Sequence, residues 1–289
     1  MKHMSRTAVW SLAFIALASA TQAPTGTVVT RELRSEALDR SWAYAAYLPN
    51  GYASSNLRYP VLYLLHGAGG NMCEWIDKAG IQRTADALVA SGDIPPTVII
   101  MPDAGTSWYV DGKEKMETAI VNELIPDVEK RFRVLVNRDG RLIAGLSMGG
   151  YGAMRFALRY PEMFAAAGLL SPAIYNPEPP EGSSARDAFG TPAYDPSVWK
   201  AHNYPALMED YLAKNKPVPM YINSGDDDEF LLGFQAVRFY ELLREHEQPA
   251  ELRIVDGAHS FSVWESTIGD ALKYMFRFSA RPTVMAPVR

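Results

Sequence analysis

The chain has 289 residues, 48% of them hydrophobic and 21% charged, which is enough apolar material for a large core. These figures exclude a disordered chain, a collagen and a small disulfide-stapled scaffold. The net charge of −5, without a long basic run, argues against nucleic acid as a partner. The single cysteine, Cys73, can form neither an internal disulfide nor a thiolate zinc site, and we expect no metal and no cofactor.

Residues 1–23 have the pattern of a secretory signal peptide. Basic residues precede an apolar run at 8–18, and small-residue cleavage sites follow after Ala20 and Ala23. The run is shorter than the roughly 20 apolar residues that span a bilayer, so we expect no stable membrane anchor. The alternatives are an uncleaved anchor or a buried N-terminal helix. The pattern predicts a secreted or periplasmic protein whose mature domain is residues 24–289.

Alternating apolar and polar residues predict an opening antiparallel pair of strands at Val28–Leu33 and Trp42–Leu48. Short apolar runs, typical of strands covered on both faces, follow at Val61–Leu65, Thr97–Met101, Leu142–Ala144, Ala165–Leu170, Met220–Asn223 and Leu252–Val255. Helical stretches alternate with them at Ile81–Ala90, Glu117–Phe132, Tyr151–Tyr160, Phe234–Glu245 and Val263–Phe278. The alternation predicts an α/β fold, a mostly parallel central sheet with helices on both faces.

The segment from Pro172 to Pro219 interrupts this alternation between two predicted strands. It is rich in proline and aromatic residues, and short helices are expected near Ser197–His202 and Ala206–Lys214. We interpret it as a small cap inserted over the carboxyl edge of the sheet, because long ordered loops are usually functional. The alternative is a surface excursion without a role in substrate binding. The tail from Ser279 is expected to be loosely held.

The sequence Gly145-Leu146-Ser147-Met148-Gly149 matches the pattern G-x-S-x-G. The motif follows a predicted strand and precedes a predicted helix, which is the strand–turn–helix arrangement of a nucleophile elbow. A sharp turn of this kind lifts the serine hydroxyl into a cleft, and its close backbone contacts favour glycine on either side. We therefore predict Ser147 as the nucleophile of acyl transfer; the alternative is a glycine-rich turn with an idle serine.

The general base is identified by elimination among the five histidines. His3 lies in the signal segment, His66 precedes the serine at a strand end, and His246 lies at a helix end. His259 follows the last predicted strand, where the histidine falls in hydrolases built on such an elbow. His202, in the predicted cap, is the rival. We predict His259 as the base.

An acidic run, Asp226 to Glu229, follows a predicted strand and precedes His259. A triad needs one buried carboxylate to orient the imidazole, but four acids compete here and the residue pattern alone selects none of them. The tetrahedral intermediate also needs two backbone amides aimed at its oxyanion. We expect them from Met148, directly after the serine, and from Ala68 in the loop His66–Gly70; the alternative for that loop is a plain glycine turn.

Together these motifs resemble the putative-esterase family of α/β-hydrolases, which includes esterase D (S-formylglutathione hydrolase), feruloyl esterases and the antigen 85 mycolyltransferases. The resemblance extends from about Arg31 to Phe278 and is densest from Glu123 to Phe164, around the serine motif. It implies the α/β-hydrolase fold, Asp228 as the acid in Gly225-Asp226-Asp227-Asp228, and His259 as the histidine in Gly257-Ala258-His259. The stretch Met101-Pro102-Asp103, followed by Trp108 and Tyr109, resembles the next loop of the family. We expect Trp108 and Tyr109 to contact substrate.

These patterns predict a secreted serine carboxylesterase with a small-molecule ester as substrate, of the short-chain or aryl type and plausibly feruloyl. Two alternatives keep the chemistry: an acyltransferase of the antigen 85 type, and a thioesterase like S-formylglutathione hydrolase. A third alternative, a hydrolase fold retained as a binding module, conflicts with the complete set of predicted catalytic residues.

Overall fold

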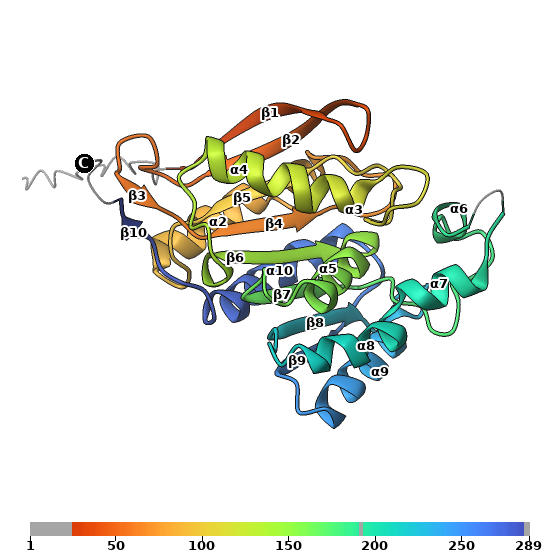
Figure 1. The fold of residues 1–289 in the computed structure, drawn as a ribbon. Coiled ribbons are helices and arrows are strands. Elements are labelled where there is room, and N and C mark those ends of the chain that lie inside the picture. Colours follow the sequence, from red (N-terminus) through yellow and green to blue (C-terminus); the bar gives the residue numbers. More distant parts are fainter. Residues whose placement is uncertain (1–24, 191–192, 286–289) are drawn as a thin grey trace, which may run out of the picture.

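The computed structural model describes residues 25–190 and 193–285. The predicted signal segment, residues 1–23, lies outside these residues. Most of the described chain forms one sheet with helices packed on both faces (Figure 1).

The central sheet has eight strands. In spatial order they are β1 (Thr27–Ser35), β2 (Arg40–Leu48), β5 (Val98–Pro102), β4 (Val61–Leu65), β6 (Arg141–Leu146), β7 (Ala166–Leu170), β8 (Met220–Gly225) and β9 (Ala250–Val255). The first two strands pair antiparallel with each other and β2 pairs antiparallel with β5, whereas β5 through β9 are parallel. Every residue of the five strands from β5 to β8 is buried, which explains their unbroken apolar runs. The predicted α/β architecture is confirmed.

Two buried clusters of apolar side chains separate the helices by face. On one face lie α3 (Met116–Ala119), η1 (Ile120–Leu124), α4 (Ile125–Arg131), α5 (Met148–Arg159), α8 (Tyr204–Ala213) and α9 (Leu232–Glu245). On the other face lie α1 (Glu74–Asp77), α2 (Ile81–Ser91) and α10 (Phe261–Phe276). The structure describes three further short helices: η2 (Arg138–Gly140), α6 (Ala185–Ala188) and α7 (Pro196–His202).

The helix predicted over Glu117–Phe132 consists of three joined segments, α3, η1 and α4, and η1 is a wide π turn. The four apolar residues that recur every fourth position, Ile120, Leu124, Val128 and Phe132, are all buried. A spacing of four exceeds the α-helical repeat, so their directions would drift by about 40° at each step along a regular helix. The π turn holds more residues and takes up part of this drift, which keeps all four side chains on the sheet.

The predicted cap divides into two parts. Between β7 and α8 the chain passes beyond the carboxyl ends of the strands, where Figure 1 shows α6 and α7. Trp199 of α7 and Phe189 after α6 are buried there in an aromatic cluster with Trp108 and Tyr151. By contrast, α8 packs on the sheet beside α5 as an ordinary crossover helix.

The described part of the C-terminal tail, which ends at Met285, contains a strand that the sequence analysis does not expect. Residues Thr283–Val284 form β10, which pairs antiparallel with β3 (Leu57–Arg58) in a second, two-stranded sheet. Strands of two residues carry no periodicity, so the sequence gives no sign of them. Among the helices that the structure describes, none combines the length and the apolar character needed to cross a bilayer.

Candidate active site

Ser147 lies at the turn between β6 and α5, with φ of 54° and ψ of −117°. This left-handed backbone is strained for any residue with a side chain and persists only where the surroundings hold it. Here the Ser147 N–H donates to Leu170 O at 2.9 Å, and the Ser147 carbonyl accepts from Ala173 N–H at 3.1 Å. A Cβ on Gly149 would overlap with the Leu65 carbonyl, and one on Gly145 would overlap with the backbone of Gly149. The glycines of the motif are therefore required by the packing of β4, β6 and α5.

His259, in the loop between β9 and α10, has its Nε2 2.9 Å from Ser147 Oγ. Its ring lies edge-on between Phe230 and Trp264, with both ring centroids 4.9 Å away. The Trp264 indole N–H donates to Ser171 Oγ at 3.0 Å, so the tryptophan is itself held in place. The imidazole is thus confined on two sides, within reach of the hydroxyl.

Asp228 is the member of the acidic run that faces the histidine. Its Oδ2 accepts from His259 Nδ1 at 2.8 Å, and Phe230 N–H donates to Oδ1 at 3.0 Å. The side chain is buried, with 1% of its surface exposed. Because Nδ1–H donates to the carboxylate, Nε2 is left as the acceptor for the Ser147 hydroxyl proton. Glu229, next in sequence, instead accepts from the His259 backbone N–H at 3.1 Å.

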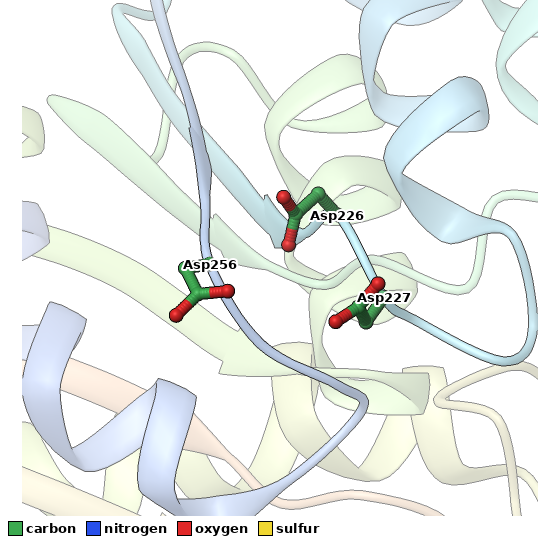
Figure 2. Close-up of side chains that lie close together, drawn as sticks. All are labelled: Asp226, Asp227 and Asp256. Atoms are coloured by element: carbon green, nitrogen blue, oxygen red, sulfur yellow. The ribbon is translucent and has the colours of Figure 1, made fainter.

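The other acids of the run face solvent. Asp226 and Asp227 lie beside Asp256, from the loop after β9, and Figure 2 shows the three carboxylates side by side. All three residues are exposed, and Asp226 Oδ1 accepts from Gly257 N–H at 3.0 Å, which ties the two loops together. Exposed acidic groups are common in proteins. Within the described residues, none of these three carboxylates forms a hydrogen bond with the Ser147 hydroxyl, whose side-chain partner is His259.

The remaining candidate histidines lie elsewhere. His202, the rival base, donates from Nδ1–H to Val198 O and packs on Phe189, without a hydrogen bond to Ser147 in the described chain. Burial lowers the pKa of His202. His66 is buried at the end of β4, where its Nε2 accepts from Ala104 N–H at 2.8 Å. Its Nδ1–H then donates to Gly67 O at 2.6 Å, and burial lowers the pKa of this imidazole as well.

The two predicted oxyanion donors come from two segments, the start of α5 and the loop after β4. Met148 is the first residue of α5, and the first amides of a helix have no carbonyl partner within it. Ala68 lines the same cleft as Ser147, and no protein acceptor for its N–H is found in the described part of the chain. The helix dipole of α5 also favours negative charge at this point.

The cleft above Ser147 has a volume of about 450 Å³. Trp108, Tyr175 and Phe230 contribute aromatic surface to it, and residues Pro180 to Ser184 of the excursion after β7 close one side. Trp108 is held by a hydrogen bond from its indole N–H to Ser184 Oγ at 3.1 Å. Tyr175 and Phe230 are not among the residues predicted to contact substrate; the signal in the sequence for Phe230 is its place two residues after Asp228.

Tyr109 does not reach this cleft. Its side chain is fully buried, and its hydroxyl donates to the His66 carbonyl at 3.0 Å. The structure therefore does not bring Tyr109 to a position where it contacts substrate, and gives it a structural place behind the loop that carries Ala68. Of the two residues predicted to contact substrate, Trp108 lines the cleft and Tyr109 does not.

Comparison with known proteins finds that this chain is similar to esterases. The sequence profile of the family described as "Putative esterase" matches residues 35–275. The endo-1,4-beta-xylanase/feruloyl esterase of Xylanibacter ruminicola is 37% identical over 154 residues, 50% of this chain and 21% of that protein. An esterase of Mycobacterium tuberculosis is 31% identical over 243 residues, 74% of this chain and 51% of that protein. The chain thus spans about half or less of the length of these two relatives.

A solved structure of a ferulic acid esterase is also similar to this chain. It superimposes with a TM-score of 0.74 at 30% sequence identity, over 88% of this chain and 99% of that one. The similarity therefore covers nearly the whole sheet and its helices.

Proposed function

The chain belongs to the putative-esterase family, and from this premise we propose that it is a serine carboxylesterase that works through an acyl-enzyme. The observation that carries the proposal is the hydrogen-bonded series Ser147 Oγ, His259 and Asp228, with 2.9 and 2.8 Å between successive partners, in which Ser147 lines a cleft. A serine, an imidazole and a buried carboxylate in this order are the groups that acyl transfer requires.

In the first half of the reaction, Ser147 Oγ attacks the ester carbonyl carbon while His259 Nε2 takes the hydroxyl proton. The carbonyl oxygen becomes an oxyanion, which the N–H groups of Ala68 and Met148 stabilise. Asp228 holds the imidazole in the productive tautomer and stabilises its protonated form. When the intermediate collapses, the proton passes from His259 to the leaving alcohol and the acyl group stays on Ser147.

In the second half, water takes the place of the alcohol. His259 removes a proton from the water as it attacks the acyl-enzyme carbonyl, and a second oxyanion forms in the same site. Collapse of this intermediate breaks the bond to Ser147 Oγ, and His259 returns the proton to the serine. The products are one carboxylic acid and one alcohol for each water consumed.

Esters of short or aromatic acids are the substrate class that the cleft favours. Trp108, Tyr175 and Phe230 offer flat apolar surface within about 450 Å³, a volume suited to a small acyl group rather than a long chain. The similarity to a ferulic acid esterase over 99% of that chain supports an aryl acyl group of the feruloyl type.

The proposal is tested by labelling and substitution. A fluorophosphonate should modify Ser147 in the wild-type protein, and peptide mapping should find no label in Ser147→Ala. Ester hydrolysis should fall by about 10⁵–10⁶-fold in Ser147→Ala and His259→Ala, and by about 10⁴-fold in Asp228→Asn. Full activity in Ser147→Ala would contradict the mechanism, and transfer of the acyl group to an added alcohol in preference to water would favour the acyltransferase alternative.

We also propose that the protein is exported. The support is the order of features in residues 1–23, in which a basic start, an apolar run and small residues at the cleavage sites follow one another. Export places the esterase where polymeric or extracellular esters are accessible.

A further inference from the structure

The loop that carries Ala68 contains the residue type least able to hold its own shape. Gly67, directly before Ala68, has no side chain and rotates more freely than any other residue type. A Cβ at this position would overlap with the Leu146 side chain, so the packing behind the serine requires glycine here. The direction of the Ala68 N–H depends on the two backbone torsions of Gly67, and other groups must fix them.

The first of these groups acts on the peptide unit that contains the Ala68 N–H. A peptide is planar, so the Gly67 carbonyl and the Ala68 N–H belong to one rigid plate and point in opposite directions. The carbonyl accepts from His66 Nδ1 at 2.6 Å and from Gly70 N–H at 3.1 Å. These bonds hold the carbonyl end of this peptide unit and leave the Ala68 N–H at the opposite end, and Ala68 itself lines the cleft.

The second group acts on the preceding peptide unit. The Gly67 N–H donates to Glu74 Oε2 at 3.0 Å, and the carbonyl of the same unit, that of His66, accepts from the Tyr109 hydroxyl at 3.0 Å. Both peptide units that flank Gly67 are therefore bonded, and both of its torsions are set. Glu74 is the one carboxylate among these partners.

Glu74 is a buried carboxylate that lies outside the predicted catalytic residues. The residue begins α1, only 7% of its surface is exposed, and its other oxygen lies 3.2 Å from Lys78 Nζ. Burying a carboxylate costs free energy unless hydrogen bonds and an opposite charge compensate it. Both compensations are present, and the backbone N–H that supplies one of them belongs to the loop of the proposed oxyanion donor.

We propose that Glu74 is a positioning residue for the oxyanion site: its carboxylate fixes the Gly67 peptide and thereby aims the Ala68 N–H. The proposal rests on the esterase function proposed above. Gly70 reinforces it, because a Cβ there would overlap with both oxygens of the Glu74 carboxylate. Gly70 leaves open the space that the carboxylate occupies, so Gly70→Ala is a way to displace Glu74 without removing it.

The test compares Glu74→Ala, Glu74→Gln, Gly70→Ala and the double variant. Glu123→Ala is the matched control, since Glu123 also accepts backbone N–H groups, those of Glu36 and Ala37, in the remote turn between β1 and β2. Steady-state kinetics on a chromogenic short-chain ester give kcat and KM per active site, with active sites counted by fluorophosphonate labelling. The inhibition constant of a trifluoromethyl ketone, whose hemiketal oxyanion occupies the same site, is measured alongside.

In Glu74→Ala we expect kcat to fall about 10- to 100-fold, less than the complete loss of an oxyanion donor, while KM stays within about threefold. The inhibition constant of the ketone should rise by a similar factor, because it mimics the transition state. In Glu74→Gln kcat should stay within about threefold of the wild-type value, since the amide oxygen still accepts a hydrogen bond from the Gly67 N–H. Gly70→Ala should lower kcat when it is the only substitution. In the double variant with Glu74→Ala it should cause no further fall in kcat.

Wild-type kcat and ketone affinity in Glu74→Ala would overturn the proposal. A smaller fraction of labelled chains with an unchanged kcat per active site would also overturn it, and so would an equal fall of kcat in Glu123→Ala. Either result would mean that a general structural defect is responsible. A wild-type chain that neither hydrolyses esters nor reacts with the fluorophosphonate would overturn the esterase function itself, and the positioning role with it.

Discussion

Trp108 and Tyr109 are neighbours in the chain but enter opposite surroundings, one lining the cleft and the other buried behind it. Both have positive φ, 54° and 56°, a conformation that aromatic residues rarely adopt. Ser147, with φ of 54°, and Ser171, with φ of 40°, lie at the same edge of the sheet. Of these four residues, only Ser147 lies in a sequence motif that predicts a strained backbone, because glycines flank it on both sides. The direction of Tyr109 could not be predicted because no local pattern encodes a left-handed aromatic residue.

The acid of the predicted triad could not be predicted from the local residue pattern either. Asp226, Asp227, Asp228 and Glu229 are chemically alike, and the residue pattern alone does not separate them. Burial separates them in the structure, since Asp228 is 3% exposed whereas the other three are exposed. Which side chain of a run turns inward depends on the turn after β8, a tertiary property. The family resemblance selected Asp228 where the pattern left four choices.

His66 predicts a dependence of stability on pH. Burial lowers its pKa, and a proton on Nε2 would break the bond that this atom accepts from Ala104 N–H. The unfolded chain then binds the proton more readily, so the stabilisation is complete above the ordinary histidine pKa of about 6.5 and is lost as the pH falls below it. The lowered pKa of His202 acts in the same direction.

The measurement is urea unfolding between pH 5 and 7.5. The free energy of unfolding of the wild type should decrease on acidification, and it should decrease less steeply in His66→Gln and in His202→Gln. A slope that neither substitution changes would show that other groups cause the acid sensitivity.

At the scale of elements, the sequence predicts well what is long and periodic. The eight strands of the main sheet and the helices α2, α5, α9 and α10 correspond to predicted segments, with ends that differ by a few residues. The elements it misses are short: β3, β10, α1, η2 and α6 span two to four residues each. Such segments owe their structure to contacts with distant parts of the chain. The π turn η1 is likewise a response to packing on the sheet rather than to local propensity.

Helix α5, which begins at the proposed nucleophile, is fixed to its neighbours by a buried ion pair. Arg155 Nη2 lies 2.5 Å from Glu117 Oε2 of α3, and Nη1 donates to the His202 carbonyl at the end of α7 at 3.0 Å. Tyr151 of α5 donates to the same carbonyl at 3.0 Å. One arginine thus joins the nucleophile helix, a sheet-covering helix and the excursion.

Arg155→Met should lower the free energy of unfolding by about 3 kcal/mol, because the buried Glu117 carboxylate then keeps only the half-exposed Arg159 as a charged partner, beside the Tyr160 hydroxyl. Adding Glu117→Gln should restore part of that loss, since the uncompensated charge is then gone. Chemical denaturation of the two single variants and the double variant gives the coupling. Strictly additive losses would mean that the pair does not act as a unit.

At the scale of the whole molecule, stability comes from a large apolar core that lies on both faces of the sheet. The single cysteine leaves no internal cross-link to form, so an oxidising compartment adds nothing to this core. A chain proposed to be exported therefore folds by burial alone, which its length permits.

Two outcomes follow for the exported protein. Its N-terminus in the extracytoplasmic fraction should be Thr21 or Pro24, one residue past the predicted cleavage sites, as determined by N-terminal sequencing. Its unfolding temperature should be the same with and without a thiol reductant. An intact Met1 on the exported protein would contradict cleavage, and a lower unfolding temperature in reductant would reveal a cross-link between chains.

The excursion between β7 and β8 has a consequence for how such a protein can diversify. These two strands are neighbours and parallel, so their connection needs one crossover helix, a role that α8 fills. The residues after Ala173 and before α7 can therefore change in length and composition without altering strand register or the backbone bonds of Leu170 and Ala173 that hold Ser147. Recombination that exchanges this one segment would deliver new binding surface to an unchanged reaction centre, which makes it the natural unit for grafting and for library design.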